Sequence, residues 1–142
     1  MSNSHPLSTS PIKEVVSIIP CIQQSVSDCV VACVAMLLGI PYPDVSQAAP
    51  QLVKRARKKG ASEYTLRKLV RTLGSTLHKM PYKAEDNPTG ILFLEAGRPT
   101  YPPHAVVLFQ GILINPSDGL LWDAETYLTL HTYTPEALFV LD

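Results

Sequence analysis

Residues 23–38, QQSVSDCVVACVAMLL, contain the most informative change of pattern in the chain, because a polar run ends at Cys29 and an apolar helical pattern begins there. A helix that is apolar on nearly every side is a buried one. We therefore predict that residues 29–38 form the central core helix. Gly39 suits the position after a helix, and Pro41 prevents the helix from continuing.

Asp28 is a good N-cap for this helix, because its side-chain oxygen can accept from backbone N–H groups that the first turn leaves unpaired. Cys29 is then the first helical residue, at the positive end of the helix dipole. Such a position lowers the pKa of a thiol and raises its thiolate fraction. Cys29 is thus either a nucleophile or a small buried hydrophobic residue. The presence or absence of a general base near it distinguishes the two interpretations.

The length and composition of the chain predict one domain and a reducing compartment. The 142 residues suffice for a domain that buries roughly 68% of its unfolded surface. We expect residues 1–12 to be a flexible tail and residues 13–142 to be a single domain. Three cysteines do not indicate a disulfide framework, and no segment resembles a signal peptide or a membrane span of ~20 residues. A cytoplasmic location is the resulting expectation.

The charges of the chain cancel, with 12 basic and 12 acidic residues, so the net charge indicates neither a nucleic-acid nor a membrane partner. One local group is strongly basic and is called the basic face below: Lys54, Arg55, Arg57, Lys58, Lys59, Arg67, Lys68 and Arg71. We interpret it as the solvated face of two helices, with a docking surface for an acidic partner as the alternative. The oligomeric state is not indicated.

Helices are predicted before strands along the chain. A second helix is expected at residues 43–49, and a third at residues 63–73, with Ser62 as its N-cap and Gly74 at its end. Short branched and aromatic segments then predict strands at 75–80, 91–94, 105–109, 112–115 and 137–141, with a weaker continuation at Leu121, Trp122, Tyr127 and Leu128. This order is typical of an α+β domain with helices packed on an antiparallel sheet.

A cysteine nucleophile needs a general base, and His104 is the best candidate among four histidines. Pro102 and Pro103 fix the approach of the chain, and His104 stands where the strand 105–109 begins. A histidine there can direct its ring at a helix N-terminus. The other three lie in the tail or in segments without a second functional group: His5, His78 and His131.

The residue that orients His104 depends on strand register. If Gln110 and Gly111 form a two-residue hairpin turn, Asn115 lies diagonally across from His104 on the same face, within side-chain reach. A slip by one residue would place Asp118 opposite His104 instead. We prefer Asn115, because Gly111 suits the short turn.

The developing oxyanion needs a hydrogen-bond donor, and Gln23 is the candidate. It lies six residues before Cys29, so its side-chain amide and the Cys29 backbone N–H could form an oxyanion hole worth roughly 3–4 kcal/mol. Gln24 is the competitor, and the sequence alone hardly separates the two.

These motifs together resemble the C39-type, papain-like cysteine peptidases. The family pattern of an Asp-Cys pair with a Gln six residues before the Cys matches Gln23, Asp28, Cys29 and Ala32, and further similarities follow at residues 60–62, 66, 73–74, 104–108 and 114–116. The resemblance implies a papain-like α+β fold. It also implies a triad of Cys29, His104 and Asn115, with Gln23 in the oxyanion hole.

Two positions depart from the family pattern. Val30 replaces the usual Gly after the cysteine, which could crowd the nucleophile, and Asn115 replaces the usual Asp. An Asn can still hold an imidazole, as in papain. The membrane-spanning and ATPase regions of the exporter type are not part of this sequence, so cleavage of leader peptides is not implied.

The resulting hypothesis is a C39-like thiol hydrolase that cleaves a peptide or isopeptide amide and uses no cofactor or metal ion. Deamidation or acyl transfer by the same residues is an alternative, and so is an inactive domain that binds a peptide in the cleft. A metal site of Cys29, Cys33 and His104 is the weakest alternative, because a fourth ligand is missing.

Overall fold

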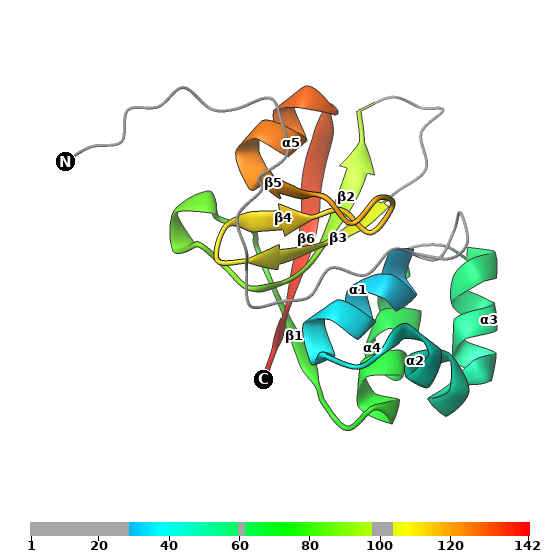
Figure 1. Ribbon diagram of the computed structural model, residues 1–142. Helices are drawn as coiled ribbons and strands as arrows, with labels where there is room; N and C mark the ends of the chain where they lie inside the picture. Colours follow the sequence, from blue (N-terminus) through cyan, green and yellow to red (C-terminus); the bar gives the residue numbers. More distant parts are fainter. Residues whose placement is uncertain (1–28, 60–61, 98–103) are drawn as a thin grey trace.

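The computed structural model describes residues 29–59, 62–97 and 104–142. The elements in chain order are α1 (Cys29–Leu38), α2 (Tyr42–Ala48), α3 (Pro50–Lys59), α4 (Glu63–Thr72), β1 (Leu77–Met80), η1 (Ala84–Asp86), β2 (Gly90–Ala96), β3 (His104–Phe109), β4 (Ile112–Ile114), β5 (Leu121–Asp123), α5 (Ala124–Leu130) and β6 (Tyr133–Leu141). The strands form an antiparallel sheet in the order β1-β6-β2-β3-β4-β5. In Figure 1, α1 to α4 are grouped together and α5 lies apart from them. The α+β class is therefore confirmed.

The sheet carries hydrophobic residues on both faces, since side chains alternate along each strand. In one cluster, the four helices α1, α2, α3 and α4 pack against strand residues such as Phe93, Ala105, Val107 and Phe139. The other joins α5 with the alternate strand residues, such as Leu94, Val106, Leu108 and Leu138. We call these the α1 cluster and the α5 cluster.

Helix α1 is buried as the sequence predicts. All residues from Cys29 to Met36 are buried, and Val30 to Val34 have no exposed surface. Removing a valine side chain from water stabilises a fold by about 1.5–3 kcal/mol, so this helix is a large part of the core. Gly39 ends it with a φ of +67°, in the left-handed region that glycine tolerates.

The second and third predicted helices, α2 and α4, agree with the prediction to within a residue or two, and α3 lies between them where no helix bounds were predicted. Helix α2 begins at Tyr42 instead of Pro43, and α4 ends at Thr72 instead of Leu73. Ser62 caps α4, because its Oγ accepts a hydrogen bond from the backbone N–H of Thr65 at 3.4 Å.

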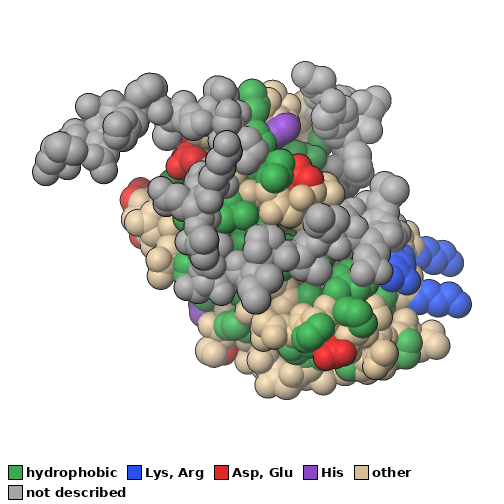
Figure 2. All heavy atoms as spheres, viewed as in Figure 1, with side chains coloured by type: hydrophobic (Ala, Val, Ile, Leu, Met, Phe, Trp, Pro, Cys, Tyr) green, Lys and Arg blue, Asp and Glu red, His purple; other side chains and the backbone are tan. Residues whose placement is uncertain are grey.

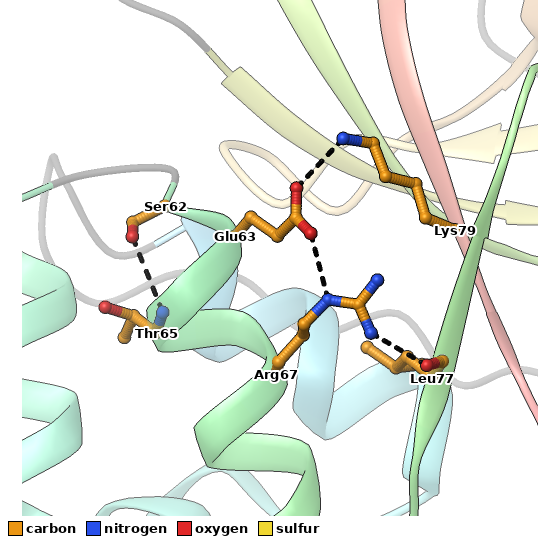
Figure 3. A network of polar contacts seen from close by, with 6 residues as sticks. All are labelled: Ser62, Glu63, Thr65, Arg67, Leu77 and Lys79. Atoms are coloured by element: carbon orange, nitrogen blue, oxygen red, sulfur yellow. Dashed lines mark hydrogen bonds and ion pairs between the residues drawn. The ribbon is translucent and has the colours of Figure 1, made fainter.

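Polar contacts join α4 to the sheet (Figure 3). Glu63 accepts from Arg67 Nε at 3.0 Å and from Lys79 Nζ at 3.1 Å, and Arg67 also donates to the backbone oxygen of Leu77 at 2.9 Å. The bonds from Lys79 and Arg67 hold the pKa of Glu63 below its ordinary value. The start of α4 is thus fixed against β1.

The region after β4 differs from the prediction. Tyr127 and Leu128 were expected to continue a strand pattern, but they lie in helix α5. The physical reason is the cap at Asp123, whose Oδ2 accepts from the backbone N–H and the hydroxyl of Thr126, both at 3.0 Å. The cap starts a helix directly after β5.

The last strand is longer than predicted and lies inside the sheet. β6 covers Tyr133–Leu141 instead of residues 137–141 and lies between β1 and β2. It contains Pro135, which has no N–H to donate. The pairing with β2 shifts register between Phe93 and Leu94, so Pro135 lies at an irregularity where a missing donor is tolerated.

Within the three described ranges, no single helix is long and apolar enough to span a membrane. Helices α1 and α2 would reach the required length only together, and they are bent by 107° relative to each other.

Candidate active site

The side chains of His104 and Asn115 are in direct contact. Nε2 of His104 lies 3.0 Å from Oδ1 of Asn115. His104 is the first residue of β3 and is half-buried, and Asn115 follows β4 and is 8% exposed. Two side chains 11 residues apart in the chain thus form one polar unit at an end of the sheet.

A second hydrogen bond indicates which nitrogen of His104 carries the proton. Oδ1 of Asn115 also accepts from the backbone N–H of Ser117 at 3.1 Å, which identifies that atom as the carbonyl oxygen. A carbonyl oxygen only accepts, so Nε2 of His104 donates to it. Nδ1, on the other side of the ring, is then the proton acceptor of the neutral imidazole.

The contact follows from the register of the β3–β4 hairpin. Phe109 pairs with Ile112, and Gln110 and Gly111 have φ values of +50° and +85°, as a two-residue turn requires. Asn115 is further held by its own backbone, since its N–H donates to Leu120 O at 3.0 Å and its carbonyl accepts from Gly119 N–H at 2.7 Å. The turn and the loop together place Asn115 near His104.

Asp118 does not take the place of Asn115. The register has no one-residue slip, and Oδ1 of Asp118 accepts from the backbone N–H of Leu120 at 2.9 Å on the exposed side of the loop. Its negative charge nonetheless acts on His104.

The environment of His104 favours the neutral imidazole. Burial lowers the pKa of His104 from its ordinary value of 6.5, and the hydrogen bond to Asn115 and the charge of Asp118 oppose this shift only in part. An unprotonated ring at neutral pH is the form that a general base requires.

Cys29 is the first residue of α1 and is 5% exposed. It belongs to the α1 cluster together with Ala105, and α1 packs against β3. Because side chains alternate along β3, His104 lies on the α5 face of the sheet with Val106 and Leu108, so the α1 cluster does not by itself bring Cys29 to the His104 ring. In Figure 1 the first turn of α1 and the beginning of β3 lie on the same side of the view. The expected cap Asp28 and the candidate oxyanion residues Gln23 and Gln24 lie outside the described residues.

Val30 has no exposed surface and packs in the α1 cluster. Its side chain therefore belongs to the hydrophobic core.

The other described histidines are bound elsewhere. Nδ1 of His78 lies 2.6 Å from Oδ1 of Asp142, and the ring of His131 packs against Tyr127 and Trp122. His5 lies outside the described residues. No group of three His, Cys, Asp or Glu side chains within those residues could hold a metal ion.

Sequence reasoning missed one neighbour of His104. The ring of Tyr133 is stacked on the imidazole, with centroids 5.9 Å apart and planes inclined by 27°. Tyr133 begins β6, and no local pattern in the sequence indicates that this strand passes close to β3.

Comparison with known proteins gives a structural similarity only. No family model matches the chain, and no curated protein matches its sequence. Among solved structures, the chain is similar to a double glycine motif protease from an AMS/PCAT transporter, crystallised in complex with the leader peptide. The TM-score is 0.58 at 16% sequence identity, covering 92% of this chain and 96% of that one. The chain therefore has a C39-like fold.

Proposed function

We propose that this protein is a C39-like cysteine hydrolase that cleaves a peptide or isopeptide amide. The observation that carries the proposal is the bond between His104 Nε2 and Asn115 Oδ1 at the start of β3, the strand against which the Cys29 helix packs. The similar solved structure is a protease in complex with a peptide, which supports a peptide as the class of substrate.

In the proposed reaction, the Cys29 thiol transfers its proton to Nδ1 of His104 and its sulfur attacks the amide carbonyl. Asn115 holds the ring with Nδ1 available. The side-chain amide of Gln23 and the backbone N–H of Cys29 stabilise the oxyanion. His104 then gives its proton to the leaving amine, and water releases the acyl group from the sulfur by the reverse sequence of proton transfers.

Labelling of Cys29 with iodoacetamide across pH tests the nucleophile without a known substrate. We expect labelling with a midpoint below the ~8.5 of an ordinary thiol, and a return toward that value in His104→Ala. Cys33 is the internal control, since it lies one helical turn away with no exposed surface. If Cys29 titrates like an ordinary thiol in the wild type, the activated nucleophile is refuted.

Mass spectrometry of a peptide library incubated with the protein identifies the reaction. Hydrolysis gives two fragments, whereas deamidation changes the mass by about 1 Da and acyl transfer joins two peptides. Cys29→Ala is the control and should form no product. Peptide binding without any product in the wild type would instead support the inactive binding domain.

The basic face supports an acidic segment in the substrate or partner. Glu63 is the only acidic residue from position 45 to 84, and it is bound to Arg67 and Lys79. Figure 2 shows basic side chains projecting on the side of the molecule where α3 lies. The ring of Tyr64 is exposed and is in cation–π contact with Arg55 and Lys68, at 5.0 and 5.6 Å from its centroid.

Charge reversal tests this docking surface. Lys54→Glu with Lys58→Glu should weaken binding of a Glu-rich peptide and reduce the salt dependence of that binding. Lys83→Glu, at an exposed position outside the basic face, is the matched control. Equal binding by the double variant and the control would show that the basic face is only a solvated surface.

A further inference from the structure

The imidazole of His104 is restrained in two different directions. The bond to Asn115 acts at the ring edge, through Nε2, and leaves rotation about the line from Nε2 to Oδ1 open. The ring of Tyr133 lies against the face of the imidazole, at 5.9 Å and 27°, and opposes that rotation. The two contacts together fix the plane of the ring.

The topology of the sheet explains why Tyr133 reaches His104. His104 pairs with Leu94 of β2, and Tyr133 pairs with Ala96 on the other side of the same strand. Residues two apart on a strand share a face, so the side chains of His104 and Tyr133 lie on one face with β2 between them.

The ring of Tyr133 is itself in contact with a second tyrosine, Tyr127. The two rings are stacked, with centroids 6.1 Å apart and planes inclined by 8°. Tyr127 is 4% exposed and packs against Trp122 and His131, at 5.6 and 4.4 Å between centroids. The start of β6 is also in contact with α5, the helix that carries Tyr127 (Figure 1). We call His104, Tyr133 and Tyr127 the aromatic column.

We propose that Tyr133 is a positioning residue for His104, holding the imidazole in the plane in which Asn115 accepts from Nε2 and Nδ1 remains available to the Cys29 thiol. This role rests on the proposed function. It has a chemical consequence as well, because the face of an aromatic ring attracts a cation. The imidazolium that forms when His104 takes the thiol proton is stabilised by the Tyr133 ring.

The test compares Tyr133→Leu, which removes the ring but keeps an apolar side chain, with Tyr133→Phe, which keeps the ring. The first readout is the tautomer ratio of His104, measured by nitrogen NMR on protein with labelled histidine. The second is the pH profile of Cys29 labelling. Tyr133→Phe should match the wild type. Tyr133→Leu should lower the ratio of Nε2–H to Nδ1–H tautomer about two- to tenfold and move the labelling midpoint toward that of an ordinary thiol.

Two further variants make the result decisive. Tyr133→Met is a second ring-free variant for the case in which Leu disturbs the strand, and thermal denaturation checks that each variant is folded. Tyr64→Leu removes a tyrosine ring that is 52% exposed on α4 and should change neither readout. The role of Tyr133 is overturned if folded ring-free variants keep the wild-type ratio and profile, or if Tyr133→Phe loses them equally.

The outcomes separate this inference from the proposed function. A wild-type Cys29 that labels as an ordinary thiol refutes the proposed function, whatever Tyr133 does, and the positioning role is lost with it. An activated Cys29 in the wild type together with unchanged behaviour of Tyr133→Leu refutes only the role of Tyr133.

Discussion

Nε2 of His104 donates a hydrogen bond to Oδ1 of Asn115 over 3.0 Å, and this bond leaves Nδ1 as the basic nitrogen of the ring. The bond exists because the turn at Gln110 and Gly111 sets the register of β3 and β4. It depends on a neutral amide, which fixes the ring without adding a negative charge beside it.

The first prediction concerns Asn115. Asn115→Ala removes the acceptor for Nε2, so we expect His104-dependent hydrolysis by Cys29 to fall roughly 10²-fold or more. Asn115→Asp keeps an acceptor and adds a charge, which should raise the pKa of His104. Peptide cleavage rates and NMR titration of His104 measure the two effects.

Ser117→Ala is the control for both Asn115 variants. It removes an exposed hydroxyl but keeps the backbone N–H that donates to Asn115. The rate should therefore stay at the wild-type level. Equal rates for Asn115→Ala and Ser117→Ala would show that Asn115 does not orient the base.

The second prediction concerns the protonation of His104 in Cys29→Ala, where no thiol interacts with the ring. Burial should make the imidazole titrate below the ~6.5 of an exposed histidine, as followed by proton NMR. Because the pKa of His104 is lowered in the folded state, the unfolded chain binds more protons in the range between that pKa and the ordinary value of 6.5. His104 therefore favours the folded state above pH ~6.5, and this stability is lost as pH falls through the folded-state pKa. A midpoint at or above the ordinary value of 6.5 would contradict the expectation.

The third prediction concerns Glu63 and acid stability. Lys79 and Arg67 lower its pKa in the folded state, so its contribution is present above the ordinary value of 4.5 and is lost as pH falls through the folded-state pKa. Glu63→Gln should reduce the free energy of unfolding at pH 7 by roughly 1 kcal/mol or less, since the pair is largely exposed. The difference from wild type should be smaller at pH 3 than at pH 7, because the carboxylate is lost as the pH falls through its folded-state pKa.

Urea denaturation at the two pH values measures this effect. Glu85→Gln, an exposed acidic residue in η1, is the control and should leave the unfolding free energy unchanged at both. A loss for Glu63→Gln that is the same at both pH values would mean that the charge of Glu63 is not its cause.

The fourth prediction concerns the pairing of β2 with β6. A Cβ at Gly90 would clash with the backbone oxygen of Phe139, so Gly90→Ala must push the two strands apart. We expect a loss of more than about 2 kcal/mol in the free energy of unfolding. Gly74→Ala is the comparison, because φ is +94° and nothing lies within 4 Å.

Gly74→Ala should cost only the strain of its backbone conformation, about 1–2 kcal/mol. The same denaturation experiment compares both variants. If Gly90→Ala is as stable as the wild type, the strands are not as closely paired as the structure describes.

Much of the site could be predicted from local pattern. The apolar run from Cys29 predicts a buried helix, because no other environment suits a helix without a polar side. Gly111 favours the hairpin, because it tolerates the positive φ that a two-residue turn requires. Once the turn is known, the pairing of the two strands is fixed. That pairing places Asn115 diagonally across from His104 on the same face.

The remainder could not be predicted, because it depends on contacts between distant segments. The cap at Asp123 starts α5 where the apolar pattern alone suggests a strand. The place of β6 between β1 and β2 follows from tertiary packing, and the register shift opposite Phe93 and Leu94 determines which of its residues faces His104. Spacing along the chain therefore predicts the position of Cys29 at the start of α1 and the contact between His104 and Asn115. The ring of Tyr133 against the imidazole was settled only by the folded sheet, because strand order and register are properties of packing that no local periodicity encodes.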